Sequence, residues 1–173
     1  MSYLTTLTLV HVVISLIGIA SGFVVLGGLL ESRRQERTTG LFLATTVATS
    51  ATGFLFPFER FLPSHAFAVL SLVLLAVAIY ARYSAHLAGG WRPAYVVTAL
   101  TSQYLNVFVL VVQLFQKVPA LKALAPTQSE APFAVTQLAL LVAFVGVTTL
   151  AVRRFHPEST PVRVDGGRAV PQH

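Results

Sequence analysis

The residue best placed to do chemistry in this sequence is His11, which stands inside a long uncharged run from about Leu4 to Leu30. An ionisable side chain in such a run is a candidate functional group. A histidine there can bond a quinone oxygen, ligate a haem iron or respond to pH. The alternative is a neutral imidazole that bonds only Asn106 or a backbone carbonyl.

Polar side chains in the run from Tyr95 to Gln113 are the second candidate for a site. At ~100° per residue, one helical face collects several of them, while the opposite faces carry Val, Leu and Phe. The stripe comprises Tyr95, Thr98, Ser102, Asn106 and Gln113, and Gln103 is a further polar residue of the run. Such a stripe is stable in lipid only if it faces protein or a cavity. We therefore expect this helix at the centre of a membrane bundle.

Together these groups predict a pocket between the first, fourth and fifth apolar runs. We expect it to open outward and to bind a lipid-like or quinone-like ligand. Its predicted lining is His11, Asn106, Gln113 and Gln137, with Gln103 and Ser102 as further ligand-binding candidates. The alternative is that these amides only join helices, since such bonds contribute about 0.6 kcal/mol each on average in membrane proteins.

The histidines of the sequence suggest a second kind of site, one that binds haem. A buried b-type haem usually takes two histidines that face each other across a helical bundle. His11 and His65 both fall toward the same predicted side of the membrane and could form one such pair. A single-haem redox protein is therefore an alternative function, and we predict no other metal site.

Enzymatic signatures are lacking in the sequence. It contains no cysteine, which excludes disulfides, thiolate catalysis and cysteine-ligated metal clusters. No Ser/His/Asp set, HExxH motif or phosphate loop occurs. The six carboxylates all lie outside the apolar runs, at Glu31, Glu36, Glu59, Glu130, Glu158 and Asp165. We therefore expect a protein that is not an enzyme.

The composition is that of a membrane protein, with 55% hydrophobic and only 10% charged residues. A soluble domain would have about 25% charged residues. The sequence predicts an all-α integral membrane bundle of five transmembrane helices within residues 1–156, and a disordered tail at 157–173 that is rich in proline, glycine and charge. The predicted spans are about 4–30, 40–58, 65–87, 93–115 and 132–152, and a short interfacial helix is predicted after the fourth.

Two local patterns refine this bundle. Gly18 and Gly22 form a GxxxG pair, which lets two helix backbones approach closely. Tyr80, Arg82 and Tyr83 crowd the end of the third span, where interfacial aromatic rings and snorkelling cations are expected.

The basic residues predict an orientation. Of the 12 Lys and Arg residues, three (Arg60, Lys117 and Lys122) lie on the side of the N-terminus in a five-span chain, and the other nine lie on the opposite side. The positive-inside rule then places the N-terminus outside and the C-terminus in the cytoplasm. Since these charges sit at the ends of apolar runs, we expect the lipid bilayer, and no nucleic acid, as their partner.

Two stretches, VATSATGFLFPFER at 47–60 and LFQKVPALKALAPTQSEAPF at 114–133, carry a resemblance. In them the sequence resembles small uncharacterised bacterial multi-pass inner-membrane proteins. The resemblance implies a location in the bacterial inner membrane, and it implies no activity and no functional residue. An accessory subunit of a larger membrane complex, or a homo-oligomer joined through the GxxxG face, remains an alternative function.

Overall fold

The chain, seen in a computed structural model, is described at residues 2–56, 63–157, 164–165 and 168–169. Helices make up almost all of this part, with one pair of two-residue antiparallel strands near its end. The elements in order are α1 (Tyr3–Leu30), α2 (Glu36–Gly53), α3 (Pro63–Ile79), the π-helical turn η1 (Tyr80–Ser84), α4 (Trp91–Lys117), α5 (Pro119–Leu124), α6 (Ala131–Arg154), β1 (Val164–Asp165) and β2 (Arg168–Ala169). The all-α prediction is confirmed, while most of the predicted disordered tail lies outside the described residues.

Four helices of the described chain are long and apolar enough to cross a membrane: α1, α3 with η1, α4 and α6. The second predicted span, 40–58, corresponds to α2, which begins earlier at the charged pair Glu36–Arg37 and ends at Gly53. Charges in its first turn and six threonines after them make α2 less apolar than the other long helices. The end of that predicted span, residues 57–58, lies outside the described residues.

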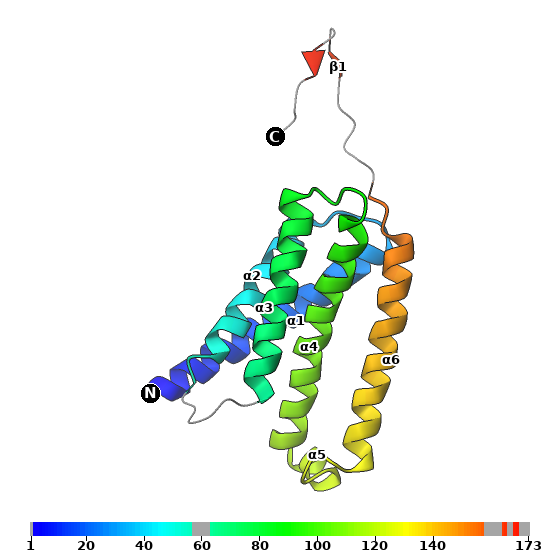
Figure 1. Ribbon diagram of the computed structural model, residues 1–173. Helices are drawn as coiled ribbons and strands as arrows, with labels where there is room; N and C mark the ends of the chain where they lie inside the picture. Colours follow the sequence, from blue (N-terminus) through cyan, green and yellow to red (C-terminus); the bar gives the residue numbers. More distant parts are fainter. Residues whose placement is uncertain (1, 57–62, 158–163, 166–167, 170–173) are drawn as a thin grey trace.

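The long helices form two groups that cross each other (Figure 1). Helices α1 and α2 pack side by side as a hairpin and run obliquely to α3, α4 and α6. Helix α4 lies between α3 and α6 and also contacts α1 and α2. It is thus the central helix, the position predicted from its polar stripe.

The core is concentrated where α1 and α2 cross the first half of α4. Tyr95, Val96 and Leu100 of α4 are almost completely buried, together with Phe42 of α2 and Leu75 of α3. In α1, most of the buried residues lie in the second half, between Gly18 and Leu29. The first half of α1 is mostly exposed, so this helix is anchored to the bundle by its C-terminal half.

The two glycines of the GxxxG pair serve contacts inside the chain. A Cβ atom at Gly18 would lie 3.2 Å from Oγ1 of Thr45 on α2. A Cβ atom at Gly22 would lie 2.1 Å from Oε1 of Gln103 on α4, well inside van der Waals contact. Gln103 is fully buried, and its Nε2 donates to the carbonyl oxygen of Ile19 at 2.9 Å. The pair therefore lets α1 approach both α2 and α4.

Arg82 does not snorkel outward, which corrects the expectation from the sequence. Its side chain is only 4% exposed, and Nη2 lies 3.0 Å from Oε2 of Glu36 in an ion pair that is not aligned as a hydrogen bond. Its guanidinium carbon lies 5.3 Å from the centre of the buried Tyr95 ring, a cation–π contact. The π-helical turn at 80–84 adds a residue to the helix and places Arg82 inward, so α2, η1 and α4 are joined by this cluster.

We predict that Gly22→Ala lowers the free energy of unfolding by about 1–3 kcal/mol, because the new methyl group must displace a buried, hydrogen-bonded side chain. The measurement is an SDS titration of the protein purified in mild detergent. Gly27→Ala is the matched control, since a Cβ atom there meets nothing within 4 Å and Ala is the better helix former. Equal losses in the two variants would contradict the close approach at Gly22.

We also predict that Glu36→Gln lowers the free energy of unfolding by about 1–2 kcal/mol, between the values for exposed and fully buried pairs. The physical reason is that the change leaves the buried Arg82 charge without its carboxylate. Glu31→Gln is the control, because the Glu31–Arg33 pair is exposed on both sides. The same SDS titration should show almost no effect for the control.

Candidate functional site

A groove of about 550 Å³ lies between α1, α2, α3 and α4. Its walls come from the first half of α1, the end of α2, the start of α3 and the second half of α4, which is the end of the bundle where α1 diverges from α4. The lining residues are Thr8, His11, Val12, Ser15, Leu16, Ile19, Thr49, Ser50, Gly53, Phe56, His65, Phe67, Ala68, Ser71, Leu105, Asn106, Val109, Leu110, Gln113, Leu114 and Lys117. The groove is therefore mainly apolar, with a few polar groups.

His11 is half-buried in this groove and held by two neighbours. Its Nδ1 lies 2.8 Å from Oγ1 of Thr52 on α2. The edge of its ring meets the ring of Phe56 at 5.3 Å and nearly a right angle. The hydrogen-bond partner is thus neither Asn106 nor a backbone carbonyl, the two partners considered from the sequence.

Asn106 and Gln113 line the same groove from α4. Asn106 is half-buried, and its Nδ2 donates to Oγ1 of Thr46 at 3.3 Å. Gln113 is exposed near the end of the helix, and Lys117 lies one turn further on. Three of the predicted ligand-binding residues, His11, Asn106 and Gln113, are therefore brought together.

The other three predicted residues lie away from the groove. Nε2 of Gln137 donates to the carbonyl oxygen of Phe108 at 3.3 Å, which joins α6 to α4. Gln103 joins α4 to α1, and Ser102 donates to the carbonyl of Thr98 in its own helix. The predicted pocket between the first, fourth and fifth spans is corrected accordingly, because α3 and α2 form the remaining walls and no residue of α6 lines the groove.

Two hydroxyl groups in the groove have no hydrogen-bond partner within the described residues. Oγ of Ser71 belongs to a residue that is 4% exposed, and Oγ1 of Thr49 is itself inaccessible to solvent. A buried polar group without a partner costs about 1–3 kcal/mol. Ser71 is the only polar group in the centre of its apolar run, and Thr49 lies on a threonine face of α2. These two features of the sequence could have identified Ser71 and Thr49 as candidates. The sequence does not show that both residues line the same groove as His11.

His65 lines the groove from α3 and is 5% exposed. Its ring lies 5.5 Å from that of Phe54. The two histidines predicted as a haem pair therefore share one groove. No group of three or more His, Cys, Asp or Glu side chains comes together in the part of the chain described here.

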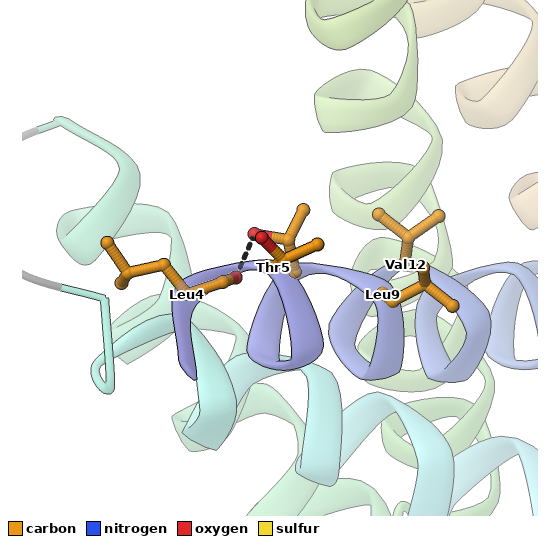
Figure 2. Close-up of a pocket in the computed structure, with 5 residues that line it drawn as sticks. Leu4, Thr5, Leu9 and Val12 are labelled. Atoms are coloured by element: carbon orange, nitrogen blue, oxygen red, sulfur yellow. Dashed lines mark hydrogen bonds between the residues drawn. The ribbon is translucent and has the colours of Figure 1, made fainter. Parts of the chain in front are cut away.

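A second hollow, of about 440 Å³, lies on α1 alone (Figure 2). It is lined by Leu4, Thr5, Thr8, Leu9 and Val12. The hydroxyl of Thr8 donates to the carbonyl of Leu4 at 2.8 Å, so it is satisfied by its own helix. With a single helix as its wall and mainly methyl groups on its surface, this hollow offers no polar recognition.

Comparison of the chain with protein-family models, with curated proteins and with solved structures finds no match.

We predict that Ser71→Ala leaves the free energy of unfolding of the ligand-free protein unchanged or raises it by up to about 1 kcal/mol, because the hydroxyl removed bonds nothing. Ser102→Ala is the matched control. It removes a buried hydroxyl that donates to the carbonyl of Thr98 at 3.0 Å, and it should lower the stability by about 0.5–1 kcal/mol. Equal losses for the two variants in an SDS titration would show that the Ser71 hydroxyl is bonded after all.

Proposed function

We propose that this chain is a small, non-enzymatic protein of the bacterial inner membrane that binds a lipid-like or quinone-like ligand in the groove between α1, α2, α3 and α4.

A membrane location is supported by the surface as well as by the length of the helices. Helix α6 exposes Val135, Leu138, Val142 and Val145, each more than half exposed. A continuous apolar face of this kind is a liability in water, but it is the expected surface in lipid. The long helices α1, α3 with η1, α4 and α6 supply four candidate spans.

We infer that α2 is the fifth span. It packs along α1 as a hairpin, and its 18 residues extend about 27 Å, close to the thickness of the hydrocarbon layer. Two of its threonines, Thr45 and Thr52, hydrogen-bond to their own helix, which lowers the cost of placing them in a bilayer. Five spans and the nine-to-three division of basic residues then support a groove on the outer side.

The observation that carries the ligand proposal is the polar end of an apolar groove. The unpartnered hydroxyls of Ser71 and Thr49 share this groove with His11 and Asn106. A volume of about 550 Å³ with apolar walls and a few polar groups is typical of a small-molecule site. An amphiphile that enters from the lipid would place its polar end beside His11 and Asn106, next to these hydroxyls.

A single haem is the second candidate, because His11 and His65 line the same groove. Both would have to turn a ring nitrogen toward one iron. Visible absorption of the purified protein decides this, since a Soret band would favour haem over the amphiphile.

A role as an accessory subunit is less well supported, because the surfaces predicted to bind a partner are covered within the chain. The GxxxG face of α1 is covered by α2 and α4, and the first half of the polar stripe is buried in the core. A partner subunit or a second copy would instead use an exposed apolar face such as that of α6.

We predict that native mass spectrometry of gently solubilised protein shows a monomer with a discrete added mass, and that His11→Ala abolishes that mass. The reason is that His11 is the polar anchor at the end of the groove. His156→Ala is the control, because this histidine is exposed at the C-terminal end of α6, outside the groove. Retention of the ligand by His11→Ala would show that the groove is not the site.

A further inference from the structure

The contact between His11 and Thr52 determines which ring nitrogen of His11 carries the proton. Oγ1 of Thr52 lies 2.8 Å from Nδ1 of His11, 2.8 Å from the carbonyl oxygen of Ala48 and 3.1 Å from that of Thr49. A hydroxyl has only one hydrogen to donate. Two of its three close contacts must therefore be explained without that hydrogen.

Only one arrangement makes both of the 2.8 Å contacts favourable. If the Thr52 hydroxyl donates to the carbonyl of Ala48, its oxygen accepts a hydrogen bond from a protonated Nδ1 of His11. If the hydroxyl instead donated to Nδ1, two oxygen lone pairs would face each other at 2.8 Å. The first arrangement fixes the neutral ring as the Nδ1–H tautomer, so Nε2 carries the lone pair.

That lone pair is available to a molecule in the groove. His11 lines the groove, and its ring also contacts the ring of Phe56, with the two ring planes nearly perpendicular. Nε2 makes no hydrogen bond to any residue in the described part of the chain. Because Nε2 is an acceptor, it can bind a ligand group that donates a hydrogen. A ligand carbonyl oxygen is also only an acceptor, so its lone pairs would be repelled by the lone pair of Nε2.

Asn106 adds a second acceptor on the opposite wall. Its amide donates to Thr46, and its carbonyl oxygen receives no hydrogen bond from the described residues. The hydroxyls of Ser71 and Thr49 can donate or accept, so they adapt to either kind of ligand. The preference of the groove is therefore set by its two acceptors.

We propose that the groove selects amphiphiles that end in a hydroxyl group, which donates its hydrogen to Nε2 of His11. For a quinone couple this means the reduced quinol rather than the oxidised quinone, and for a lipid it means an alcohol. This proposal rests on the proposed ligand-binding function and names the chemical class of its ligand. Thr52 is then a positioning residue, which acts only through the tautomer of His11.

The tautomer can be measured before any ligand is added. In ¹⁵N-histidine-labelled protein at mildly alkaline pH, the ¹⁵N chemical shifts distinguish protonated from unprotonated ring nitrogens, and the His11→Gln spectrum assigns the signals of His11. We expect protonated Nδ1 and unprotonated Nε2, and a mixture of tautomers in Thr52→Val, where Nδ1 loses its acceptor. A dominant Nε2–H tautomer in the unchanged protein would overturn the proposal.

Ligand selection is tested with pairs that differ in the hydroxyl hydrogen. Decylubiquinol is compared with decylubiquinone, and dodecanol with its methyl ether, by equilibrium binding to the full chain in detergent. We expect the hydroxyl member of at least one pair to bind about tenfold more tightly, the value of one good hydrogen bond. The pair that shows the preference tells a quinol from a lipid alcohol as the source of the hydroxyl.

The variants separate this proposal from the function on which it rests. Thr52→Val should still bind ligand but lose most of the tenfold preference, whereas Thr45→Val, a control on the same helix, should keep it. Binding without any hydroxyl preference would overturn this inference and leave the ligand-binding function standing. No binding of any probe would overturn both, and a Soret band would assign the Nε2 lone pair to iron instead.

Discussion

The structure depends on the close approach of α1 to α4 at Gly22. Here the fully buried Gln103 reaches into α1 and donates to the carbonyl of Ile19, in space that only a glycine leaves open. This contact holds α1 across α4 at an oblique angle (Figure 1). The buried residues of α1 lie mostly between Gly18 and Leu29, around and beyond this contact, and on the N-terminal side the helix diverges and is mostly exposed. The groove occupies the space opened by that divergence, so one hydrogen-bonded crossing produces both the core and the site.

The polar groups at the two ends of the bundle have different surroundings. At the end with η1, the buried Arg82 forms an ion pair with Glu36 and a cation–π contact with the ring of Tyr95, although Nε and Nη2 of Arg82 and the Tyr95 hydroxyl make no hydrogen bond in the described chain. At the other end, the hydroxyls of Ser71 and Thr49 have no protein partner in the described chain and line a groove. The first arrangement holds opposite charges together and joins three helices, whereas the second leaves hydroxyl groups beside a volume that a small molecule can enter. This difference is why we assign the function to the groove and a structural role to Arg82.

His11 connects the candidate functions through a single nitrogen atom. Its bond to Thr52 leaves Nε2 as an acceptor, and an acceptor nitrogen can receive a hydroxyl hydrogen or bind iron. A quinol, a lipid alcohol and a haem are therefore alternatives for the same position. The apolar walls of the groove suit all three, so the chemistry at Nε2 decides among them.

The sequence by itself determined most of the helices and their capacity to cross a membrane, because the length and apolar character of each run decide whether it can form a membrane-spanning helix. It also identified His11 as a candidate, and helical periodicity placed Asn106 and Gln113 on one face of the central helix. Periodicity does not tell which neighbour covers each part of that face. Only the tertiary structure showed that Ser102 and Gln103 lie in the buried half, that Gln137 bonds α4 away from the groove, and that Arg82 points inward through a π-helical turn. It alone also brought Thr49, Thr52 and Ser71 beside His11, since that depends on where α1 crosses the other helices, and the crossing is set by contacts between residues far apart in the chain.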